Sequence, residues 1–107
     1  MAFGFPAYHT EDYFSSAETI AELQEAILDV VEDLGWQIRI GSRTRMMAVA
    51  SGKLLSWGEM IDIELFPDLM LTITSKCKLP TQCIDWGKNR RNVRKFLIRL
   101  EEFLEET

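Results

Sequence analysis

The apolar residues between Ile20 and Leu34 recur at the spacing of one helix face. They are Ile20, Leu23, Ile27, Val30, Val31 and Leu34, and Gly35 follows them directly. Intervals of three and four residues place side chains on one side of a helix, and glycine commonly follows a helix end. Ser15 and Glu18 have the spacing of a capping box. The pattern therefore predicts an amphipathic helix that begins near Ser15 and ends at Gly35.

Four shorter segments alternate apolar and polar residues, as half-buried strands do. They are the segments 36–40, 45–51, 60–65 and 70–75. A three-residue loop, 67–69, between the last two would pair Leu65 with Leu71 and keep the apolar side chains on one face. Leu69 is, however, a poor residue for the left-handed position that such loops often need.

A final apolar stripe predicts a helix that starts within a few residues of Asn89. Its members are Val93, Phe96, Leu97, Leu100, Phe103 and Leu104, and an irregular loop over 77–87 precedes it. Two amphipathic helices and four strands with one apolar face each pack most simply in two layers. The predicted fold class is α+β in the order α-β-β-β-β-α, a four-stranded antiparallel meander with two helices packed on one face.

The first 14 residues show neither the helical nor the strand period. They nevertheless hold five of the chain's eleven aromatic residues: Phe3, Phe5, Tyr8, Tyr13 and Phe14. Disordered tails are normally poor in aromatic residues. We therefore expect 1–14 to be an aromatic arm, part of which docks on the domain or on a partner, and 15–107 to be a single α+β domain.

Charge limits the classes of partner. The chain has 107 residues and a formal net charge of -5, so phosphate polymers and anionic membranes are disfavoured. Nothing at the start resembles a secretory signal, and no apolar run could span a bilayer, so a cytoplasmic location is expected. Two cysteines, Cys77 and Cys83, are too few for a disulfide scaffold or a tetrahedral zinc site, and no metal or cofactor is expected.

The segment before the final helix concentrates polar and basic residues. Its candidate anion-binding residues are Asp85, Gly87, Lys88, Asn89, Arg90 and Arg91. Free N–H groups at a helix start attract anions, and bases there oppose the helix dipole, which suggests a compensating benefit. In the alternative interpretation Asp85 or Asn89 caps the helix, and the bases pair with the acidic first helix.

This segment also resembles a known family. Ser75 in the last strand, followed by Asp85, Gly87 and Asn89 before a terminal helix, is similar to the end of a family of small uncharacterised bacterial proteins. Those proteins carry a Ser/Arg-rich strand and then an Asp-x-Gly-x-Asn motif. Here lysines stand in place of the arginines, and the resemblance covers about 25 residues. It implies no reaction.

The predicted strand phases place three methionines on the sheet face away from the helices. They are Met46, Met60 and Met70. A flexible apolar surface can form a dimer interface, hold a ligand, or be covered by the arm. These residues are the candidate interface.

No nucleophilic or metal-binding constellation occurs in the sequence, so it predicts no catalytic residue. The expected function is a non-catalytic, bacterial interaction module that forms a homodimer and binds a protein partner. The alternative is a small-ligand protein or enzyme with an anion pocket at the Asp85–Asn89 junction.

Overall fold

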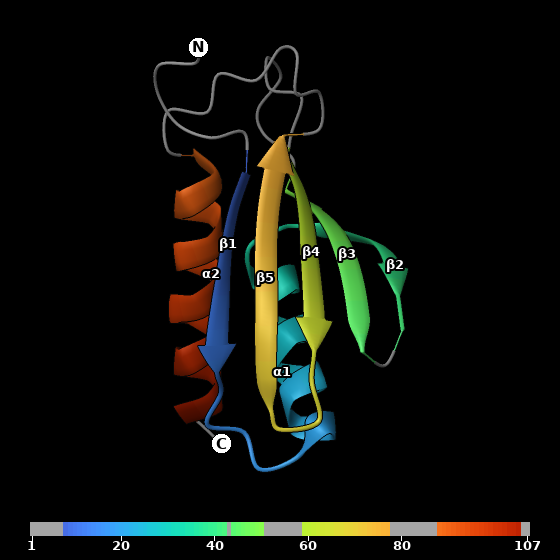
Figure 1. The fold of residues 1–107 in the computed structure, drawn as a ribbon, viewed down its shortest axis with the longest axis vertical. Coiled ribbons are helices and arrows are strands. Elements are labelled where there is room, and N and C mark those ends of the chain that lie inside the picture. The colour runs from blue at the N-terminus through green and yellow to red at the C-terminus, as the bar shows by residue number, and fades with distance from the viewer. Residues whose placement is uncertain (1–7, 43, 51–58, 78–87, 106–107) are drawn as a thin grey trace.

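The chain forms an antiparallel five-stranded sheet with two helices on one side (Figure 1). The structure is a computed structural model and describes residues 8–42, 44–50, 59–77 and 88–105. The elements are β1 (Tyr8–Phe14), α1 (Ile20–Asp33), β2 (Gln37–Gly41), β3 (Arg45–Ala50), β4 (Glu59–Leu65), β5 (Met70–Cys77) and α2 (Lys88–Glu105). The strand order is β1-β5-β4-β3-β2. The α+β class, the antiparallel sheet and the two helices are therefore as predicted.

The prediction of four strands is wrong, because part of the N-terminal segment is a strand. β1 pairs along its whole length with β5, from Tyr8 opposite Lys76 to Phe14 opposite Met70. The side chains that β1 turns towards α2 include His9 and Glu11, which are polar and half-buried. The sequence of 8–14 therefore lacks the alternation of apolar and polar residues that would have predicted a strand. Residues 8–14 are thus an edge strand of the sheet.

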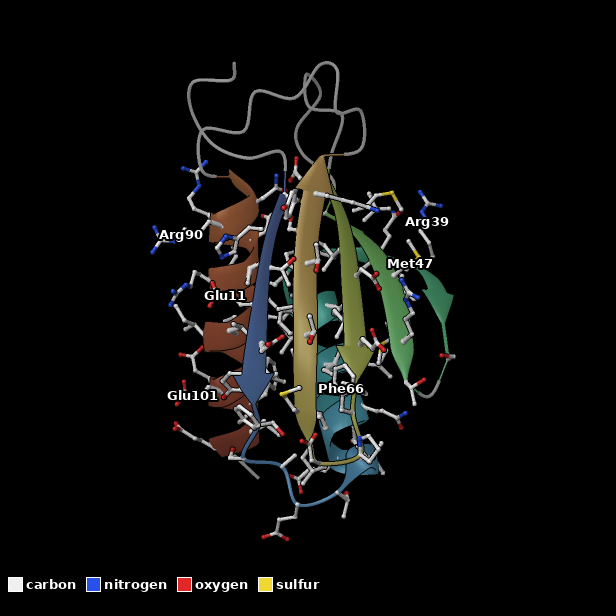
Figure 2. The ribbon with its side chains drawn as sticks, in the orientation of Figure 1. Glu11, Arg39, Met47, Phe66, Arg90 and Glu101 are labelled. Atoms are coloured by element: carbon white, nitrogen blue, oxygen red, sulfur yellow. The ribbon has the colours of Figure 1, made fainter. Side chains whose placement is uncertain are left out.

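Glu11 joins the first strand to the second helix. Its Oε2 atom lies 2.8 Å from His9 Nε2 and 2.8 Å from Arg94 Nε. Figure 2 shows Glu11 between β1 and α2. These contacts replace the apolar packing that the inner side of an ordinary strand would provide.

The β4–β5 hairpin has the predicted register. Leu65 pairs with Leu71, and Leu69 has a φ of 69°. Two backbone hydrogen bonds close the loop, from Phe66 N to Met70 O at 2.9 Å and from Leu69 N to Phe66 O at 3.0 Å. A leucine therefore occupies the left-handed position that normally favours glycine.

The first helix begins later than predicted. Thr19 is its N-cap, and its Oγ1 accepts a hydrogen bond of 3.0 Å from Glu22 N. Ser15 instead donates from its Oγ to Leu69 O, at 2.7 Å. Thr19 and Glu22 have the same spacing as the predicted pair, so the predicted position of the cap was wrong. The helix ends as predicted, with Gly35 at a φ of 75°.

The core lies between the helices and one face of the sheet. Its buried side chains from the sheet are Met46, Ala48, Ala50, Ile61, Ile63, Leu65, Leu71 and Ile73, and those from the helices include Leu23, Ile27, Val30, Phe96 and Leu100. Trp36 stacks on Phe96, with ring centroids 6.0 Å apart. The connection after α1 therefore packs directly against α2.

Met46 contradicts the predicted methionine face. It pairs with Ile63, is 5% exposed and belongs to the core under the helices. Ala48 and Ala50 lie on that same inner face. β3 carries apolar residues on both faces, so its own alternation could not show which face turns inward.

Candidate functional site

A buried polar cluster joins the start of α2 to the sheet. Its four members are Glu59 of β4, Ser75 of β5, and Asn89 and Asn92 of α2, and each is at most 7% exposed. Ser75 continues the inward row of Leu71 and Ile73, so its hydroxyl lies on the core face of β5. The two asparagines are three residues apart and so share one side of the helix.

Hydrogen bonds connect all four side chains. Ser75 Oγ donates to Asn89 Oδ1 at 2.7 Å. Asn92 Nδ2 donates to Glu59 Oε1 at 2.9 Å and to Ser75 Oγ at 3.2 Å. Polar groups taken out of water are costly unless they are bonded, and these hydrogen bonds help to meet that requirement. Among the described residues, no buried side-chain nitrogen or oxygen lacks a hydrogen-bond partner.

The chemistry open to this cluster follows from those bonds. The Ser75 hydroxyl is fully buried and gives its proton to an amide oxygen, which is not a base. His9 lies opposite Ser75 in the β1–β5 register, but its Nε2 is bonded to Glu11. The arrangement is therefore suited to holding α2 against the sheet.

The predicted anion site is only partly described. Asn89 is buried in the polar cluster, whereas Arg90 and Arg91 are exposed on α2. Figure 2 shows Arg90 directed away from the sheet. Lys88 is the first residue of α2, and Asp85 and Gly87 lie outside the described residues. The structure thus brings Asn89 together with Ser75 of the resemblance motif.

The sheet face opposite the helices is called the open face here. In the pairing it carries Tyr8, Thr10, Asp12, Phe14, Arg45, Met47, Val49, Met60, Asp62, Glu64, Met70, Thr72, Thr74 and Lys76. Met60 and Met70 lie on it as predicted. They are far apart, because Met60 pairs with Lys76, six residues from Met70 along β5, or about 20 Å. With Met46 in the core, the three methionines form no common patch.

The centre of the open face is polar and its ends are apolar. Thr10 Oγ1 lies 2.8 Å from Thr74 Oγ1, and Thr72 Oγ1 donates to Asp12 Oδ1 at 2.7 Å. At one end Phe14 pairs with Met70, and at the other Met60 pairs with Val49. Figure 2 labels Met47 on the same side as Arg39, towards the β2 edge.

Shifted proton affinities occur at three described groups. Burial raises the pKa of the Tyr13 phenol above its ordinary value, and the charges of Glu101 and Glu105 raise it further. A hydrogen bond to Asp62 raises the pKa of Arg45. Hydrogen bonds to Asp33 and then Glu102 raise the pKa of Arg99. These shifts strengthen existing charge states and mark no acid–base centre.

Sequence reasoning missed Glu59 and Asn92. A signal was available for Asn92, because it lies four residues before Phe96 and thus on the apolar stripe. In the described part of the chain, no three His, Cys, Asp or Glu side chains gather in a way that could hold a metal ion. None of the described helices is long and apolar enough to cross a membrane.

Comparison with known families found no family model that matches this sequence, and comparison with curated proteins found no match.

Proposed function

We propose that this chain is a non-catalytic interaction module that associates with itself and binds a protein partner through the open face. The observation that carries the proposal is the exposure of aromatic side chains on the β1 side of this face, with Tyr8 at 60% and Phe14 at 74%. Aromatic residues are enriched in protein interfaces, where they bury much area at low entropic cost. Both helices lie on the opposite side of the sheet (Figure 1).

The charges of the open face favour a protein over a nucleic acid. Asp12, Asp62 and Glu64 are acidic, whereas Arg45 and Lys76 are basic, and Arg45 Nη2 already pairs with Asp62 Oδ2 at 2.7 Å. A phosphate backbone would meet a face of mixed sign. A protein surface can match such a face with its own mixed charges, and its apolar side chains can contact Phe14 and Met70.

The non-catalytic part of the proposal is supported by the buried cluster. Ser75, Asn89 and Asn92 are buried and joined by hydrogen bonds to one another or to Glu59. An enzyme would instead hold a reactive group near a substrate-accessible position.

The test begins with identification of the partner by cross-linking in cells that produce the protein at its native level. The purified partner is then titrated calorimetrically with wild type, Phe14→Asp, Thr74→Arg and a control, Glu25→Lys, at an exposed position of α1. We expect the two open-face variants to weaken binding at least about tenfold and the control to leave it unchanged.

Equal affinities for all four proteins would refute the open face as the binding surface. A thermal-shift screen with phosphorylated metabolites checks the anionic-ligand alternative. Stabilisation that disappears in Arg90→Glu or Arg91→Glu would favour that function instead.

A further inference from the structure

The exposed side of α2 is centred on an aliphatic residue. Ile98 is 59% exposed, and it lies two residues from both Phe96 and Leu100, which are fully buried. Because two residues correspond to about 200° of helical rotation, Ile98 projects opposite to the core side of α2. An isoleucine at the centre of an otherwise charged helix face is the kind of apolar contact that a second helix covers.

The charges around Ile98 have opposite signs on its two sides. Three exposed bases precede it by seven, four and three residues: Arg91, Arg94 and Lys95. Three exposed acids follow it by three, four and seven residues: Glu101, Glu102 and Glu105. Intervals of three, four and seven keep all of these side chains on the outer side of α2, and together with Ile98 they are called the α2 strip here. Figure 2 shows Glu101 on this outer side.

The order of these charges is unfavourable for α2 by itself. Its first turn contains no acid and its last turn no base, so the charges oppose the helix dipole. Arg91 and Lys95 are also four residues apart, as are Glu101 and Glu105, and like charges at that spacing repel. Within α2 alone the order of these charges is therefore unfavourable, and the ion pairs that one copy forms include Arg94 with Glu11 and Glu102 with Arg99.

A second copy reverses each of these disadvantages. We propose that two copies of this chain associate through α2, antiparallel, with a two-fold axis beside Ile98. In that register a residue lying any number of positions before Ile98 is at the same height along the helix pair as the residue lying the same number after it in the second copy. The pairs at equal height are Arg91 with Glu105, Arg94 with Glu102, Lys95 with Glu101, and Ile98 with itself.

Every charged pair across the axis is of opposite sign, and the two-fold axis makes each pair occur twice, as a closed dimer interface requires. The antiparallel direction also sets the N-terminal end of each helix beside the C-terminal end of the other, which favours both dipoles. A parallel arrangement would set Arg91 against Arg91 and Glu105 against Glu105. Charge therefore selects the antiparallel dimer.

Existing contacts within one copy are compatible with this interface. Arg94 bonds Glu11 and is 57% exposed, and Glu102 bonds Arg99 and is 51% exposed. Exposed pairs of this kind contribute little and are readily shared with further charges. The dimer would also leave the open face of each sheet on the far side from α2, so two partner molecules could bind at once.

The inference rests on the self-association in the proposed function and names its surface. Sedimentation velocity of the full chain provides the test, over about 1 to 200 μM, because one helix pair buries less than a standard interface and implies modest affinity. The variants are Ile98→Asp, Lys95→Glu, Glu101→Lys, the double variant Lys95→Glu/Glu101→Lys, and Leu28→Asp as control. Leu28 is a 45% exposed aliphatic residue of α1.

We expect a wild-type dimer, a monomeric Ile98→Asp variant, and dissociation constants raised at least about tenfold by each single charge reversal. The double variant should recover the wild-type constant, as should an equimolar mixture of the two single variants as a heterodimer. Lys95 and Glu101 are six residues apart, on different sides of the strip, and do not reach each other within one helix. Rescue must therefore act between copies, and Leu28→Asp should dimerise normally.

A wild-type chain that stays monomeric throughout this range would overturn both the self-association and the α2 interface. A dimer indifferent to Ile98→Asp would overturn the interface alone, and self-association would stand. A dimer lost in both single variants and not regained in the double variant would overturn the antiparallel register. Circular dichroism of each variant confirms that helix content is retained.

Discussion

Ser75 of β5 and Asn89 of α2 are fully buried and joined by a hydrogen bond of 2.7 Å between Oγ and Oδ1. The bond fixes the first turn of α2 at one height along the sheet. Because Asn92 donates to the same hydroxyl oxygen at 3.2 Å, one serine is shared by two helix residues. The two residues of the resemblance motif that the structure describes are thus structural partners.

Ser75→Ala should therefore destabilise the fold by about 1 to 3 kcal/mol, since it removes two hydrogen bonds to buried amide groups. Thr74→Ala is the matched control, because it removes one hydroxyl from the adjacent, half-buried position on the open face, and should cost within about 0.5 kcal/mol. Urea unfolding measures both. Equal losses would show that the buried cluster has no special role in stability.

The two methionines on opposite faces of the sheet give a second prediction. Met46→Lys places a charge in the core beside Ile63 and should cost about 3 kcal/mol or more, enough to unfold a marginal domain. Met60→Lys replaces a half-buried side chain on the open face and should cost less than about 1.5 kcal/mol. Thermal unfolding followed by circular dichroism compares them. A stable Met46→Lys variant would contradict the inward phase of β3.

Predictability from sequence differed between elements for physical reasons. The β4–β5 hairpin was predicted in its register, because both strands place apolar residues on only one face and the loop length follows from that phase. β3 carries apolar residues on both faces, and only its pairing with β4 decides which side is inward. β1 turns His9 and Glu11 inward, so a salt bridge to α2 took the place of the apolar signal.

The candidate site was predictable only in part. Asn89 and Ser75 were recognised in a motif, and their position on inward rows was available from the period of each element. The hydrogen bond between them could not be predicted, because it depends on the position of α2 along β5. Glu59 could not be predicted as a member of the cluster either, because nothing in the local sequence marks the first residue of a strand as buried.

The hairpin loop supplies a third prediction, at the left-handed Leu69. A side chain in this conformation costs about 1 to 2 kcal/mol, and glycine avoids that cost. Leu69→Gly should therefore be more stable than Leu69→Ala by about 1 kcal/mol, although glycine is the less stable of the two in ordinary strand or helix positions. Chemical unfolding of the two variants measures the difference. Alanine equal to or above glycine would refute the left-handed backbone at this position.

The Tyr13 phenol gives a prediction in pH. Its folded pKa is raised above the ordinary value of 10.0, first by burial and then by Glu101 and Glu105. A raised folded pKa means that the native state holds the proton more tightly than the unfolded chain does. The associated stability is therefore fully present below about pH 10 and is lost as the pH rises through the folded pKa.

Tyr13→Phe removes this ionisation, so the variant should gain stability relative to wild type as the pH rises from about 9 to about 11.5. Lysines titrate in the same range, but they are common to both proteins and cancel in the difference. Urea unfolding at each pH measures it, and Glu101→Gln in the wild-type background should reduce it by removing one cause of the shift. A difference that stays flat across the range would show that Tyr13 ionises equally easily in the folded and unfolded chain, and hence that β1 does not hold this phenol against α2.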